Sequence, residues 1–185
     1  MTSSAGGSPA GVDEVLDFWF ADPARAWRKD PAFDAEVRAR FEALHDAIEQ
    51  GEHEAGRDSA RGALAYVIAL DQLSRNMYRD TARMFASDAR ARAAARDAVD
   101  RGLDQELPAD RRAFLYMPFM HSEDLADQER SIELFAALGG QMIEYAERHR
   151  DIVRRFGRFP HRNALLGRAS TDEERAFLTQ PGSSF

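Results

Sequence analysis

The sequence predicts an all-α protein built as a multi-helix antiparallel array. Along almost the whole chain, apolar residues recur at the three- and four-residue spacing of amphipathic helices, and no segment shows the alternation of a half-buried strand. The segments between the predicted helices are short, which favours antiparallel packing of neighbours. With 185 residues, of which 44% are hydrophobic, the chain is long enough to bury a sizeable core.

One domain is expected over residues 12–185, preceded by a flexible tail over residues 1–11. The tail sequence, MTSSAGGSPAG, is rich in Gly and Ser and lacks the basic and apolar regions of a signal peptide. No later segment has the composition of a linker, so no further domain boundary is expected.

The composition excludes several classes of function. The sequence has no cysteine, which excludes disulfides, Cys-ligated zinc, iron–sulfur clusters and thiol catalysis. The net charge of −7 argues against a nucleic-acid partner, because such binding depends on basic side chains that neutralise phosphates. The longest apolar run, Ala63–Leu70, is too short to cross a bilayer. We therefore expect a cytoplasmic protein with no membrane partner.

Two helices are predicted in the N-terminal quarter. The first covers Val12–Phe20, and a loop over residues 21–29 follows it. Asp30 and Pro31 are residue types preferred at the N-cap and first position of a helix, and Gly51 ends this second helix. Its apolar face is predicted to contain Phe33, Val37, Phe41, Leu44 and Ile48.

Three helices are predicted in the middle of the chain. The first covers residues 59–76, and because residues 63–70 within it are apolar on all sides, it should lie near the centre of the domain. The second covers residues 87–101 and is unusually polar. Pro108 opens the third, which Pro118 should kink or end.

Three further helices are predicted at the C-terminal end. Ser122 is the expected N-cap of a helix that ends before the glycines at 139–140. Another helix covers residues 141–156 and ends at a glycine. Thr171 and Glu174 have the spacing of a capping box, so the last helix should begin near them.

The string Asp71–Asn76 places polar residues directly after the most apolar helical segment. Asp71 and Arg75 are four residues apart and can pair on one helix face. Gln72 and Asn76 have the same spacing and form a second polar ridge. Two explanations stay open: these residues belong to a functional site, or the helix end emerges into solvent with its own salt bridge.

The string Phe114–Gln128 changes abruptly from apolar residues to His, Ser and acids. A histidine such as His121, close to the carboxylates of Glu123 and Asp127, has the chemistry of a metal ligand or an acid/base pair. The alternative is ordinary N-capping, with the acids placed to favour the helix dipole.

The string Phe156–Asn163 crowds polar and aromatic groups into a loop constrained by Gly and Pro. Arg158 and Arg162 have the geometry to clamp a carboxylate or a phosphate, and His161 has the chemistry to titrate near neutral pH. The alternative is a structural loop whose arginines pair with the acids of the preceding string. The other histidines, His45, His53 and His149, are expected to be solvated.

Five strings carry a resemblance that extends from about Val12 to Phe185. They are VLDFWF, LDQLSRN, PFMHSEDLADQERS, RFGRFPHRNALLGRAST and EERAFL. On these strings the chain resembles the bacterial family called domain of unknown function nine-two-four, although Ser74 stands where the family often has Pro. The resemblance implies an all-α fold like that of tetratricopeptide superhelices, and it implies that the three polar strings belong together. It implies no activity.

The first hypothesis is a small-molecule site for an anionic ligand, either for binding or for catalysis. In it, His121 or His161 carries a proton and Glu123 or Asp127 orients that histidine. The residues expected to bind the ligand are Asp71, Arg75, Gln128, Arg158, Arg162 and Asn163. A divalent metal held by His121, Glu123 and His161 is a variant, and no other cofactor is predicted.

The second hypothesis is a tetratricopeptide-like module that binds a protein partner. In it, the polar strings form an internal scaffold in which Arg158 and Arg162 pair with Glu123 and Asp127. The first hypothesis is favoured, because a scaffold rarely needs His, Asn and Gln together with Arg and carboxylates.

Overall fold

The computed structural model describes residues 11–26 and 29–184. All regular structure within these ranges is helical and none is β-strand, which confirms the all-α prediction. The flexible tail predicted over residues 1–11 lies outside the described residues except for Gly11, as do residues 27–28 of the predicted loop. Each helix in the described part is too short or too polar to cross a membrane.

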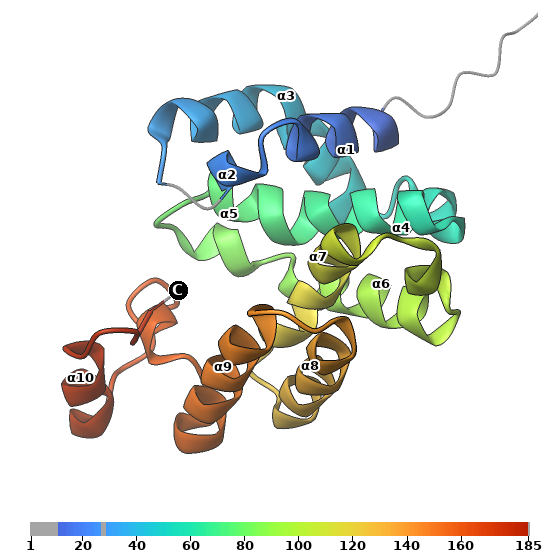
Figure 1. The fold of residues 1–185 in the computed structure, drawn as a ribbon. Coiled ribbons are helices and arrows are strands. Elements are labelled where there is room, and N and C mark those ends of the chain that lie inside the picture. Colours follow the sequence, from blue (N-terminus) through green and yellow to red (C-terminus); the bar gives the residue numbers. More distant parts are fainter. Residues whose placement is uncertain (1–10, 27–28, 185) are drawn as a thin grey trace, which may run out of the picture.

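Helices stack in layers around a central one (Figure 1). The α-helices are α1 (Val12–Ala21), α2 (Pro23–Ala26), α3 (Pro31–Glu49), α4 (Ala60–Val67), α5 (Ser74–Met77), α6 (Asp88–Asp100), α7 (Ala109–Met120), α8 (Leu125–Leu138), α9 (Met142–Phe156) and α10 (Asp172–Leu178). The short helical segments between them are η1 (Glu54–Asp58), η2 (Ile68–Leu73), η3 (Ala82–Phe85), η4 (Leu103–Glu106) and η5 (Pro160–Arg162). Helices α1 and α3 pack on one side of α4 to α5, and α6 and α7 pack on the other. The likeness to tetratricopeptide superhelices stays a prediction.

The segment predicted to be central is the core of the molecule. Every residue from Ala63 to Leu70 is at most 4% exposed. The helix expected over residues 59–76 is present as α4, η2 and α5, but its middle, η2, is a π-helix. The Ser74 hydroxyl donates to the Leu70 carbonyl across this wide turn at 2.7 Å. Such π-turns inside α-helices are frequent at functional sites, and this one carries Asp71 and Gln72.

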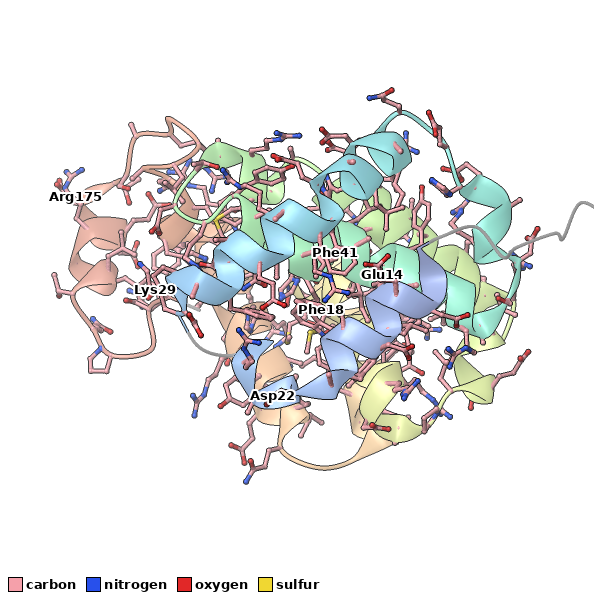
Figure 2. All side chains as sticks on the ribbon, turned by 90° about the horizontal axis from the view of Figure 1, so that it is seen from above. Glu14, Phe18, Asp22, Lys29, Phe41 and Arg175 are labelled. Atoms are coloured by element: carbon pink, nitrogen blue, oxygen red, sulfur yellow. The ribbon has the colours of Figure 1, made fainter. Side chains whose placement is uncertain are left out.

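The apolar face predicted for α3 is buried against α1 and the central helix. Phe18 of α1 and Phe41 of α3 meet where the two helices run side by side (Figure 2), with ring centroids 5.0 Å apart. Arg40 lies over the Phe18 ring and pairs with Glu14 at 3.2 Å, which covers the outer edge of this contact.

The helix ends follow the capping predictions, with one exception. The Asp30 carboxylate accepts from two backbone amides at the start of α3, and the capping box at Thr171 is present. The prediction of Ser122 as the N-cap of α8 is wrong, because Asp124 caps this helix. The Ser122 hydroxyl instead donates to the buried carboxylate of Asp127 at 2.8 Å.

Two histidines predicted to be solvated are buried. His45 lies in the apolar row of α3, between Phe41 and Ile48, and is 1% exposed. His149 lies on the buried face of α9 with Ile152 and is 5% exposed. Their positions at helical spacing from apolar residues decide their burial, although their immediate neighbours in sequence are charged.

Gly62 gives a sharp test of the packing of α4. A Cβ at this position would lie 1.7 Å from the Gly56 carbonyl oxygen, whereas a Cβ at Gly56 would meet nothing within 4 Å. We expect Gly62→Ala to lower the free energy of unfolding by roughly 1–3 kcal/mol, as overpacking does. Urea denaturation measures this change, with Gly56→Ala as the matched control. Equal effects of the two substitutions would contradict the close packing of α4 on η1.

Candidate functional site

A cavity of about 960 Å³ lies between the central helix and the C-terminal third of the chain. Its walls come mainly from α5, η3, α7, α9 and η5, and Gly182 and Ser184 also contribute to them. Each of the three polar strings contributes to the lining. The contributing residues are Gln72, Arg75 and Asn76 from the first string, Met117, Met120 and His121 from the second, and His161 and Arg162 from the third.

Cations dominate the charged part of the lining. Among the described residues, the lining contains one acid, Asp80, and five cations, which are Lys29, Arg75, Arg79, Arg148 and Arg162. The cavity therefore presents a wall suited to an anion.

Asp71 lies behind this wall with its side chain fully buried. Its carboxylate accepts from the His121 ring at 2.8 Å and from the Gln72 amide at 2.6 Å, and it pairs with Arg75 at 3.1 Å. Burial by itself would raise the pKa of Asp71, but Arg75, His121 and Gln72 together lower it well below its ordinary value. The carboxylate is therefore ionised across the physiological range.

The hydrogen bond to Asp71 fixes the tautomer of His121. An ionised carboxylate can only accept, so the Nδ1 atom of His121 carries the proton. Burial and the charge of Arg75 lower the pKa of His121, against the influence of Asp71. In the resulting neutral ring, Nε2 has no proton and is a hydrogen-bond acceptor.

Asp88 holds two of the cavity cations in place. Its carboxylate pairs with Arg75 at 3.1 Å and with Arg162 at 3.1 Å. Arg162 also donates to the His121 carbonyl at 2.9 Å and is 7% exposed. Burial lowers the pKa of Arg162 to about 10, so its guanidinium still carries a positive charge at neutral pH.

Two more imidazoles line the cavity near His121. His149 donates from Nδ1 to the Tyr145 carbonyl at 2.7 Å, and its ring centroid lies 6.2 Å from that of His121. Burial lowers the pKa of His149 to about 3 and that of His161 to about 4. At neutral pH, these rings therefore add polarity to the cavity but no charge.

Apolar side chains form the remaining part of the lining. They are Met84, Phe85, Met117, Met120, Met142 and Leu165. Methionine is unbranched and flexible, so a wall that contains several of them can adjust to ligands of different shape.

Several residues predicted for the site lie outside the cavity lining. Glu123 forms a two-pronged ion pair with Arg168 at 2.7 and 2.9 Å and accepts from the Phe159 amide at 2.8 Å. Asp127 pairs with Arg92 at 3.0 Å and with Arg96. The acid that accepts from His121 is Asp71, and the roles expected for Glu123 and Asp127 toward a histidine stay predictions.

The other three displaced residues also serve the packing of the C-terminal third. Gln128 donates to the carbonyls of Met120 and Ser122 at 2.7 and 2.6 Å. Arg158 pairs with the buried Glu174 at 2.7 Å, and Asn163 donates to the same carboxylate at 3.3 Å.

The pairing expected in the scaffold hypothesis was therefore wrong in its partners. Arg158 pairs with Glu174 and Arg162 with Asp88, whereas Glu123 pairs with Arg168. These partners lie on segments brought together by the fold, and sequence spacing gives no signal for them.

The metal set of His121, Glu123 and His161 does not come together as a cluster. Within the described part of the chain, these side chains are not among those whose ligand atoms gather within 4.8 Å of one another. Both oxygens of Glu123 are engaged by Arg168.

Sequence reasoning missed part of the lining. Arg79, Arg148 and His149 lie in runs that look like an exposed, charged helix surface. Gln72 and Asn76 gave a usable signal, since both form the polar ridge predicted beside the pair of Asp71 and Arg75.

The chain matches known proteins over most of its length. A family model described as bacterial protein of unknown function (DUF924) matches residues 15–182. The solved structure of a protein of unknown function, ATU0120 from Agrobacterium tumefaciens, is similar with a TM-score of 0.87 and 45% sequence identity, over 90% of this chain and 96% of that chain. No curated protein matches the sequence. The comparisons therefore support the fold and the family, and they name no ligand.

The low pKa values of the cavity histidines predict how stability depends on pH. Below about pH 6.5 the histidines of the unfolded chain bind protons, whereas His149 and His161 of the folded chain stay neutral down to much lower pH. The free energy of unfolding should therefore fall as the pH is lowered through this region. Histidine NMR signals measured from about pH 8 to about pH 5 should show both rings neutral throughout.

The variant His161→Gln tests how much one ring contributes to the pH dependence of stability. In His161→Gln, the dependence of stability on pH between about pH 7 and about pH 5 should be weaker than in the wild type, because one proton-binding difference is removed. A His161 signal that titrates near its ordinary pKa would contradict the burial of this ring.

Proposed function

The chain belongs to the DUF924 family of bacterial proteins of unknown function, and we propose that it binds a small organic anion in the cavity between α5 and α9. The observation that supports this most directly is a cavity cation, Arg148, for which no ion pair is recorded among the described residues. The volume of about 960 Å³ lies in the range of small-molecule sites. The compartment proposed for this binding is the cytoplasm.

Four of the five cavity cations are balanced by acids of the protein. Lys29 pairs with Asp80 at 3.2 Å, and Arg79 pairs with Asp34 at 2.5 Å. Arg75 and Arg162 are balanced by the buried Asp71 and the partly buried Asp88. With the histidines neutral, the charge of Arg148 is left over among the described residues, and a ligand with one anionic group would balance it.

The position of Arg148 suits this role. It extends from α9 beside Tyr145, with its guanidinium 5.8 Å from the centroid of that ring, and Tyr145 itself is 48% exposed. An arginine supplies a fork of donors that matches a carboxylate or a phosphate. Arg162 contributes a second positive charge to the lining, close enough to His149 to help lower the pKa of that ring.

The apolar wall defines the rest of the ligand. Four methionines, Phe85 and Leu165 would contact an uncharged part of the ligand and exclude water from around its charged end. We therefore infer an amphipathic molecule, with an anionic group at Arg148 and an apolar body against the methionines.

The dyad of Asp71 and His121 adds proton chemistry to this binding site. Asp71 holds the Nδ1 proton, and Nε2 of the neutral ring is the atom that accepts a proton or hydrogen bond from a ligand. Arg75 and Arg162 lie close enough to this dyad for their charges to affect His121 and Asp71. Proton abstraction from a bound anion is the reaction that these groups can perform.

Substitution of Arg148 tests the proposal. Thermal shift is measured with a panel of alkyl carboxylates and phosphate monoesters of increasing chain length. A ligand present at a hundred times its Kd should stabilise the wild type by about 2.7 kcal/mol. Arg148→Gln should fold normally and lose tenfold or more in affinity, because a charge-assisted hydrogen bond contributes about 1.5–3 kcal/mol.

Arg154→Gln is the matched control, since Arg154 lies on the same helix, pairs with Glu129 and does not line the cavity. It should keep the full ligand response. If no member of the panel stabilises the wild type, or if Arg148→Gln responds as the control does, the proposed anion site is wrong.

A further inference from the structure

A second cluster of polar side chains lies on α3, outside the cavity lining. His45, Asp46 and Glu49 place one ring nitrogen and two carboxylate oxygens within 4.8 Å of one another. The histidine is 1% exposed, whereas the two carboxylates reach solvent. His45 and Glu49 are four residues apart and share a helix face, so α3 itself holds the cluster together.

The hydrogen bonds of Ser87 fix the tautomer of His45. The Ser87 hydroxyl donates its single proton to the Leu70 carbonyl at 2.7 Å. Towards the Nε2 atom of His45, at 3.3 Å, this hydroxyl can then only accept. The proton of the neutral ring is therefore on Nε2, and Nδ1 has a free lone pair.

That lone pair points into the acidic cluster. Nδ1 of His45 lies 3.6 Å from an oxygen of Asp46 and 3.6 Å from an oxygen of Glu49. It is buried, and among the described residues it has no hydrogen-bond partner. Three electron-rich atoms facing one another call for a cation between them.

We propose that His45, Asp46 and Glu49 bind a divalent transition-metal ion. One imidazole nitrogen and two carboxylate oxygens form a ligand set that suits Zn²⁺ or Mn²⁺, with water completing the coordination. Ser87 already provides the acceptor for the other ring N–H, which is the arrangement that orients histidine ligands in metal sites. The ion would tie α3 through His45 to the segment that begins α6.

A metal ion at this cluster would compete with Arg83, which contacts the same acids. Arg83 pairs with Asp46 at 2.5 Å and lies 4.0 Å from Glu49 and 3.7 Å from Glu42. Its guanidinium also lies over the Tyr78 ring, 4.0 Å from the centroid. Because the Arg83 side chain is 45% exposed, it can release Asp46 and keep its contacts with Glu42 and Tyr78.

Tyr78 supplies a second polar atom beside the cluster. Its ring centroid lies 5.5 Å from that of His45, and its hydroxyl is buried with no hydrogen-bond partner among the described residues. A water bound to the metal would be a hydrogen-bond partner for this hydroxyl.

The test is isothermal titration calorimetry of chelator-treated, full-length protein with Zn²⁺. The wild type should bind one ion per chain at this site. Asp46→Asn and Glu49→Gln, which change partly exposed side chains, should each weaken binding at least about tenfold. Glu36→Gln is the matched control, since Glu36 lies on the same helix, pairs with Arg25 and contributes no atom to the cluster. It should bind as the wild type does.

Two further measurements distinguish this site from a surface carboxylate pair. Arg83→Gln should tighten binding, because it removes the competing guanidinium. The nitrogen NMR signals of His45 in the wild type should shift on addition of Zn²⁺. This measurement needs no variant, so it does not depend on whether a variant folds. Three results would overturn the proposal: no binding by the wild type, binding by Asp46→Asn and Glu49→Gln as tight as that of the wild type, or an unshifted His45 signal.

Discussion

A carboxylate removed from water has to be paired, and this requirement at Asp71 organises the centre of the molecule. Its ion pair with Arg75 stays within the central helix, whereas its hydrogen bond to His121 reaches the end of α7. Arg75 then shares Asp88 with Arg162, which carries the network to η5. Removing one partner from such a network leaves a buried charge uncompensated, which costs about 3–5 kcal/mol. The charged part of the cavity wall therefore depends on one network of mutually paired groups.

The polar strings serve two different purposes in the fold. The residues that line the cavity, such as Arg162 and His121, are held by the acids Asp88 and Asp71. Others, such as Glu123 and Arg158, hold the loop after α9 in place, because Glu123 pairs with Arg168 of that loop and Arg158 pairs with Glu174 of α10. Neighbours in one string therefore have different surroundings: His121 lines the cavity, whereas Glu123 pairs with Arg168.

Local deviations from ideal helix geometry coincide with the cavity. The π-turn of η2 carries Asp71 and Gln72 on a segment that is buried all round, and the Ser74 hydroxyl donates to a carbonyl within that turn. A regular α-helix of the same sequence would direct these side chains differently relative to Arg75. This distortion therefore positions the acid that orients His121, which lies at the centre of the proposed binding site.

The sequence by itself determined the helices, most of their caps and the central position of residues 63–70. These features depend on contacts between residues a few positions apart, or on a run so apolar that only the core can hold it. It also identified the three strings that reach the cavity, because polar residues beside buried helices stand out. The prediction that His45 and His149 are solvated was wrong, because it followed their charged neighbours in sequence and not their helical spacing from apolar residues.

Only the tertiary structure decided which charge pairs with which. Arg162 and Asp88 are 74 residues apart, and Arg168 and Glu123 are 45 apart. Arginines are numerous in this chain, and on chemical grounds each could pair with any of several acids. The choice among them depends on how the helices pack, and helical periodicity carries no information about such distant pairs.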